Sequence, residues 1–149
     1  MRALTQLLFG AMASAVICTG AIAADLDPAA IAFTLPDKIE WKGTGLSRQA
    51  IMSGDPSKPG PYIVIQKWLP GGMSRPHFHP NDRFITVLSG TWWVGTGTKF
   101  DPELTVPMPA GAVVTHFAGK IHFDGAKDEA AVLEIVGMGP ATLTDAEVK

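Results

Sequence analysis

Cysteine is almost absent from this chain: among 149 residues only Cys18 occurs. Cys18 lies in an apolar stretch near the N-terminus that we expect to be removed, so the remaining chain has no thiol. That absence excludes a disulfide framework and a thiol nucleophile. The stability of the folded chain must therefore come from a hydrophobic core.

The chain also lacks an excess of basic residues. It contains 12 Lys and Arg against 14 Asp and Glu, and the net charge is −2. A nucleic-acid-binding protein needs a basic footprint on its surface. We therefore expect no nucleic-acid partner.

The N-terminus has the pattern of a secretory signal peptide. Arg2 precedes an apolar run over residues 7–18, and Ala21-Ile-Ala23 follows it. A basic start, a short apolar run and an A-x-A site are typical of a cleaved signal, and the run is short for a membrane span. We expect residues 1–23 to be cleaved after Ala23, and the rest to be periplasmic or secreted from a bacterial cell, without membrane attachment. An uncleaved anchor is the alternative.

Cleavage would leave one domain, residues 24–149. Arg2 is the only charged residue that leaves, so the net charge changes from −2 to −3. Roughly 126 residues are enough to bury about two thirds of the unfolded surface. No internal repeat or domain linker interrupts this part of the sequence.

Long helical periodicity is absent, and short apolar segments alternate with turn residues, including 16 Gly and 12 Pro. This pattern predicts an all-β sandwich or barrel. The expected strands cover residues 31–35, 38–41, 49–52, 62–69, 84–88, 91–94, 112–117, 121–123 and 131–136. Residues 144–149 are either one helical turn capped by Thr144 or frayed.

His77 and His79 are the first candidates for chemistry. Side chains one residue apart on an extended segment point to the same face. Two imidazoles could therefore reach one metal ion, with a third ligand from elsewhere. Imidazole suits several metals, so the pair does not choose among them. Two exposed loop histidines are the alternative.

The spacing around these histidines resembles the two motifs of the cupin superfamily. The first motif covers residues 71–90, from Gly71 through the two histidines to Gly90, and the second covers residues 111–126 and includes His122. The resemblance implies a double-stranded β-helix, or jelly-roll barrel, with His77, His79 and His122 around one divalent metal ion, which could be Fe, Mn, Zn, Cu or Ni. It also implies association as a homodimer.

The sequence departs from the cupin motifs at three positions. Arg83 stands where the family has glutamate, Phe117 where it has proline, and Ala126 where it has asparagine. The glutamate is usually a fourth ligand, and a guanidinium has no acceptor lone pair. Arg83 could turn toward Asp82 or another acid, could hold an anionic substrate beside the metal, or could mark a site that has lost its metal.

Two further residues are candidates for the site. A two-residue hairpin at Ser89-Gly90 would place Trp92 on the face of Val87, where it could contact substrate or simply pack in the core. Glu134 lies in an apolar run, and we expect its carboxylate close to Arg83 or the histidines, as a catalytic base or as a partner. An outward position is the alternative.

His116 and Asp124 are assigned no role in the site. His116 is expected to be a structural or exposed histidine, and Asp124 to belong to a charged turn with Lys127 and Asp128.

Two functional classes follow from these residues. The first is a metal-dependent enzyme acting on a small, anionic molecule, with an iron-dependent oxygenase as one option and an isomerase or lyase as another. The second is a protein that binds a small ligand without chemistry, its metal site weakened by Arg83. The fold alone does not decide between an enzyme and a binding protein.

Overall fold

The computed structural model describes residues 25–148, so the predicted signal peptide lies outside the described residues. The chain divides into two units, Met1–Phe33 and Thr34–Lys149. In the first unit, the described residues contain a turn in which the backbone N–H groups of Ala30 and Ile31 donate to the carbonyl oxygen of Asp27. The second unit carries all of the described strands.

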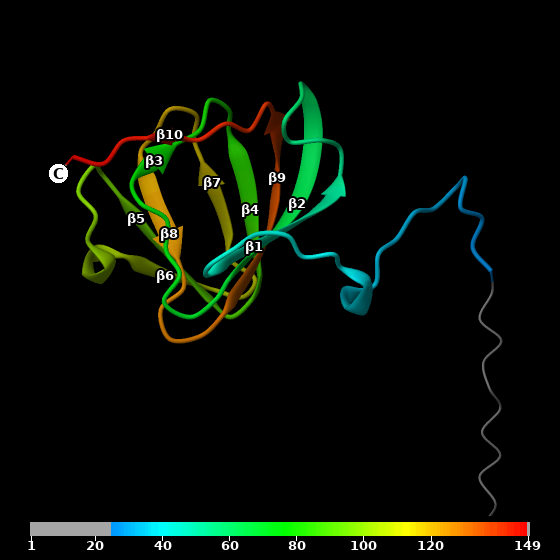
Figure 1. Ribbon diagram of the computed structural model, residues 1–149, viewed down its shortest axis with the longest axis horizontal. Helices are drawn as coiled ribbons and strands as arrows, with labels where there is room; N and C mark the ends of the chain where they lie inside the picture. Colours follow the sequence, from blue (N-terminus) through cyan, green and yellow to red (C-terminus); the bar gives the residue numbers. More distant parts are fainter. Residues whose placement is uncertain (1–24, 149) are drawn as a thin grey trace, which may run out of the picture. The chain divides into compact units, whose positions relative to one another are not determined.

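The second unit is a sandwich of two five-stranded antiparallel sheets (Figure 1). The first sheet has the order β1 (Ser47–Ser53), β2 (Gly60–Trp68), β9 (Ala131–Gly139), β4 (Arg83–Ser89) and β7 (Val113–His116). The second sheet has the order β10 (Thr144–Asp145), β3 (His77–Phe78), β8 (His122–Gly125), β5 (Thr91–Thr96) and β6 (Val106–Pro109). The predicted all-β sandwich is confirmed.

The core lies between the two sheets. Along β9 the odd-numbered residues from Ala131 to Gly137 are buried, while the even-numbered ones are more exposed. On β2, Tyr62, Val64 and Gln66 are buried in the same alternation. This period of two places one row of side chains from each strand in the interior, where Trp92 and Leu133 are each 1% exposed.

The turn at Gly90 differs from the predicted hairpin. β4 pairs with β7 and β9 in the first sheet, whereas β5 pairs with β6 and β8 in the second. The chain therefore crosses from one sheet to the other at Gly90, with a positive φ of 71°. A Cβ there would clash with the carbonyl oxygen of Ala130. Trp92 still shares the core with Val87, because the inner faces of both sheets point to the same interior.

Three expected elements differ from the structure. Residues 31–35 form no strand, and 38–41 give way to a 3₁₀ helix, η1 (Pro36–Lys38), and an isolated bridge between Lys42 and Gln49. Thr144 begins β10 rather than a helical turn. A second 3₁₀ helix, η2 (Pro102–Leu104), connects β5 to β6.

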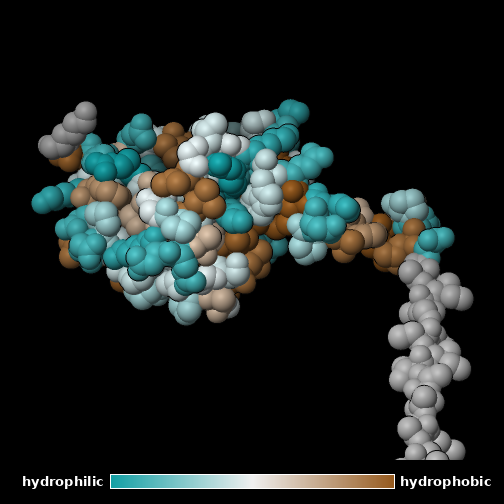
Figure 2. Space-filling view, turned by 60° about the horizontal axis from the view of Figure 1, so that its bottom comes forward, coloured by the Kyte–Doolittle hydropathy of each residue, from teal (hydrophilic) through white to brown (hydrophobic). Residues whose placement is uncertain are grey.

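The surface is of mixed polarity. On the face in Figure 2, hydrophobic residues lie between hydrophilic ones rather than forming one continuous area. Within residues 25–148, no helix has both the length and the hydropathy needed to cross a membrane.

Candidate metal and ligand site

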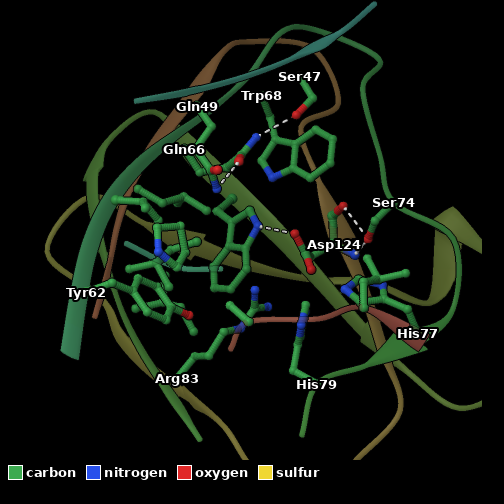
Figure 3. A pocket seen from close by; sticks show the side chains of 18 of the residues that line it. Ser47, Gln49, Tyr62, Gln66, Trp68, Ser74, His77, His79, Arg83 and Asp124 are labelled. Carbon is green, nitrogen blue, oxygen red and sulfur yellow. Dashed lines mark hydrogen bonds between the residues drawn. The ribbon is translucent and has the colours of Figure 1, made fainter. Parts of the chain in front are cut away.

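A cavity of about 430 Å³ opens between the two sheets (Figure 3). Volumes of this order suit small organic ligands. Histidines and Arg83 lie at one end of the cavity, and aromatic and aliphatic side chains form much of its wall.

His77, His79 and His122 come together as predicted. His77 lies on β3 directly opposite His122 on β8, and His79 follows β3 in the chain. The ring of His77 lies 5.0 Å from that of His79 and 4.4 Å from that of His122, measured between centroids. One nitrogen from each of the three buried rings lies within 4.8 Å of the other two.

Backbone carbonyl groups fix the orientation of all three rings. The Nδ1 atom of His77 lies 2.7 Å from the carbonyl oxygen of Arg75. The Nδ1 atom of His79 lies 2.8 Å from the carbonyl oxygen of Thr142, and that of His122 lies 2.9 Å from the carbonyl oxygen of Lys120. A carbonyl only accepts, so each Nδ1 carries the hydrogen and each Nε2 keeps its lone pair. Second-shell bonds of this kind are typical of histidine metal ligands.

The residues present therefore fit a metal ion. The Nε2 atom of His79 is buried without a hydrogen-bond partner. Burial, with a further contribution from the charge of Arg83, lowers the pKa of His79 to about 3. Burial also lowers the pKa of His122 to about 4, although the nearby charge of Asp124 acts in the opposite direction. Imidazoles with such pKa values are neutral at pH 7, as ligation requires.

Arg83 points into the same site from the first sheet. Its Nη2 atom lies 3.2 Å from Nδ1 of His116 and 3.4 Å from Nε2 of His122. Burial lowers the pKa of the guanidinium, and the charge of Asp124 opposes that shift. Because a guanidinium can only donate, both histidine nitrogens act as acceptors.

Arg83 forms no ion pair with an acid among the described residues. The pairing with Asp82 does not occur, since the Asp82 carboxylate accepts from the backbone N–H of Ala118 at 2.7 Å. The Nε atom of Arg83 is also buried without a partner. A partly buried cation with an unused donor favours an anion beside it.

His116 and Asp124 belong to the site, contrary to expectation. They are 7% and 5% exposed, and with His122 they form a second group whose ligand atoms lie within 4.8 Å of one another. The Asp124 carboxylate accepts a hydrogen bond of 3.1 Å from the indole Nε1 of Trp92. Asp124 could have been recognised from its spacing, because it follows His122 by two residues on one strand and so shares its face.

Comparison with solved structures identifies the architecture. The polyketide cyclase RemF from Streptomyces resistomycificus matches with a TM-score of 0.66 and 13% identity, covering 80% of this chain and 87% of that one. An uncharacterized protein with a double-stranded β-helix domain from Klebsiella pneumoniae matches with a TM-score of 0.61 and 19% identity, covering 78% of this chain and 97% of that one. A cupin-2 domain from Rhodospirillum rubrum matches with a TM-score of 0.59 and 13% identity, covering 76% of this chain and 78% of that one. The chain has the cupin fold.

Comparisons of sequence add nothing to this result: no protein-family model matches the chain, and no curated protein does. At identities below 20%, the structural matches establish the fold of this chain and leave its activity open.

Trp92 lines the cavity, as one of the sequence interpretations expected. It is also part of the core, at 1% exposure. The two roles are compatible, because the ring packs between the sheets while its N–H reaches Asp124.

Glu134 is not close to the site, so that prediction is wrong. It alternates on β9 with Leu133 and Ile135, which line the cavity, and therefore lies on the opposite face of the sheet. It takes part in none of the described ion pairs. Both faces of β9 carry apolar residues, so its sequence alone does not show which face is inside.

The site is divided between two walls. His77 and His122 belong to strands of the second sheet, and His79 follows one of these strands. Arg83 and His116 belong to neighbouring strands of the first sheet and are paired across them. The three predicted metal-binding histidines therefore come from one wall, and Arg83 with His116 comes from the other.

Proposed function

We propose that this cupin binds one divalent metal ion at His77, His79 and His122 and holds a small anionic molecule beside it with Arg83. The observation that carries the proposal is the set of three Nδ1 atoms held by backbone carbonyls, which leaves three Nε2 lone pairs directed into one site. A bound ion would supply Lewis-acid chemistry or, in the case of iron, redox chemistry.

The protein residues would do the binding and the positioning. Arg83 offers an unused N–H donor and a positive charge to a carboxylate or similar group, a pairing that its planar geometry favours. The three histidines are buried, and shielding from bulk water strengthens such contacts. Turnover of a small acid, as an oxygenase, isomerase or lyase, would then place this cupin among the enzymes.

One observation favours a second function, that of a ligand-binding protein without metal chemistry. The Nη2 atom of Arg83 lies 3.4 Å from the Nε2 atom of His122, the same nitrogen that a metal ion would need. A guanidinium in this position opposes a divalent cation. A site without metal would still be suited to an anion.

Elemental analysis of the untagged protein separates the two functions. Near-stoichiometric Fe, Mn, Zn, Cu or Ni that is lost in His79→Ala supports the metal site. His116→Ala is the companion variant, because it removes another buried histidine: metal lost in this variant but kept in His79→Ala would place the ion in the second group, with His122 and Asp124. Absence of metal after each ion has been added contradicts the metal proposal and favours the binding protein.

A further inference from the structure

The cavity has a second polar end, away from the histidines. Ser47 and Gln49 on β1 lie opposite Trp68 and Gln66 on β2 in the sheet register. All four line the cavity, and Figure 3 shows them grouped at the end opposite Arg83 and His79. The metal and anion chemistry makes no use of this group.

The second polar end contains an unsatisfied donor. The Gln66 side chain is buried, its Nε2 donates to the Ser47 hydroxyl at 2.7 Å, and its Oε1 accepts weakly from Gln49 at 3.5 Å. The indole Nε1 of Trp68 is buried and has no hydrogen-bond partner among the described residues. A buried donor without an acceptor is costly and rare in native proteins. An acceptor atom of a bound molecule would satisfy it.

The acceptor should be neutral. Among the described residues that line the cavity, Arg83 is the one Lys or Arg, and it lies at the other end. The donors available near Trp68 are an indole and amides, which suit a carbonyl or ether oxygen better than a second carboxylate.

The two ends are separated by an apolar middle. In the register of the first sheet, Arg83 lies in one row with Gly137 and Tyr62, while Gln66 lies four residues further along β2. Four residues of a strand span about 13 Å. Val64, Ile135 and Ile85 form the row between these two, and all three line the cavity.

The geometry points to a two-ended ligand: an anionic group held by Arg83, an apolar or aromatic body, and a neutral oxygen acceptor bound by the N–H of Trp68. The anionic end rests on the function proposed above, while the acceptor end rests on Trp68 and Gln66 alone. The ligand class is thus a keto, ester or ether acid rather than a simple acid or a diacid.

Calorimetric titration of the full chain with a matched pair of acids tests this assignment. The probes are para-acetylhydrocinnamate and para-isopropylhydrocinnamate, which differ in a carbonyl oxygen against a methyl group of similar size. The neutral para-propylacetophenone is the third probe. We expect the acetyl acid to bind roughly tenfold more tightly than the isopropyl acid, since one buried hydrogen bond distinguishes them.

Variants assign the preference to one side chain. Trp68→Phe should bring the affinity ratio of the two acids close to one and leave the isopropyl acid unchanged. Trp93→Phe is the matched control, because Trp93 lies next to Trp92 on β5, packs under Lys127 and is outside the cavity lining. The affinity ratio of the two acids in this variant should equal that of the unaltered protein.

The outcomes separate this inference from the proposed function. Equal affinities for the two acids, a ratio that survives Trp68→Phe, or no binding of either acid overturns the two-ended ligand. Arg83→Met should weaken both acids by a similar factor and leave their ratio in place. If both acids bind this variant as tightly as before, the anionic role of Arg83 fails, while the ratio still reports on Trp68.

Discussion

Replacing Arg83 by Met should tighten metal binding. The Nη2 atom of Arg83 lies 3.4 Å from Nε2 of His122, and zinc–imidazole bonds are about 2.1 Å long. An ion on this nitrogen would therefore lie no more than about 5.5 Å from the guanidinium. With an effective dielectric constant of about 20, a unit charge and a divalent ion at this distance repel by about 6 kcal/mol.

The measured effect should be smaller, because the Arg83 side chain can turn away when an ion enters. We expect the dissociation constant for Zn²⁺ in Arg83→Met to fall by about ten- to a hundredfold, which corresponds to roughly 1.4 to 2.7 kcal/mol. Isothermal titration with Zn²⁺, supported by the visible spectrum of the Co²⁺ form, measures this change.

Lys67→Met is the control for the loss of a positive charge. Lys67 is on β2 between the inward residues Gln66 and Trp68, and its Nζ atom lies 5.8 Å from the ring centroid of Trp41. Its replacement should leave the zinc affinity unchanged. A zinc affinity in Arg83→Met that is equal to or weaker than that of the unaltered protein would refute the electrostatic reasoning.

Three further predictions concern acid stability, the crossing between the sheets, and export. Burial lowers the folded-state pKa values of His79 to about 3 and of His122 to about 4. The unfolded chain therefore binds protons first as the pH falls, and the stability that is present above pH 6.5 is lost toward these values. Urea unfolding should show that the free energy of unfolding falls by about 2 kcal/mol per such histidine between pH 7 and 5, and no loss would contradict the burial of neutral rings. Gly90 and Gly71 have similar φ values of 71° and 78°, but a Cβ at Gly71 meets nothing within 4 Å. Gly71→Ala should therefore lower the free energy of unfolding by about 1–2 kcal/mol, and Gly90→Ala should lower it by about 1–3 kcal/mol more in the same assay. Equal losses in the two variants would exclude the clash. We propose that the protein is exported and begins at Ala24, so the intact mass of the extracytoplasmic protein should correspond to that start, and a mature form that retains Arg2 would contradict cleavage.

Local pattern was enough to predict the main strands, whereas the grouping of the three histidines was predicted from the resemblance to the cupin motifs. The segments around β2 and β9 carry apolar residues in long alternating runs, so their strands were predicted to within a few residues. The histidines were found because glycines at fixed spacings accompany them in two motifs. The strand signal depends on short stretches of sequence, which determine local geometry directly, while the meeting of His77 with His122 was implied by the resemblance alone.

Features that depend on contacts between distant segments could not be predicted in the same way. The turn at Gly90 has the sequence of a hairpin, but the strands on either side pair with β9 and β8, which lie far along the chain. The face of Glu134 is ambiguous, because its neighbours two residues away are apolar as well. His116 enters the site through its pairing with Arg83, which only the sheet register reveals.

The division of the site between its two walls affects how such a protein can diverge. A substitution on the first sheet can change the charge facing the ligand without moving any of the imidazoles on the second sheet. Arg83 is one such position, where a single side chain differs in sign from the glutamate of the cupin motif while the three histidines keep their carbonyl partners. The charge that faces a bound ion and the positions of the imidazoles around it are therefore set by different sheets, and one can be altered by a single substitution while the other stays in place.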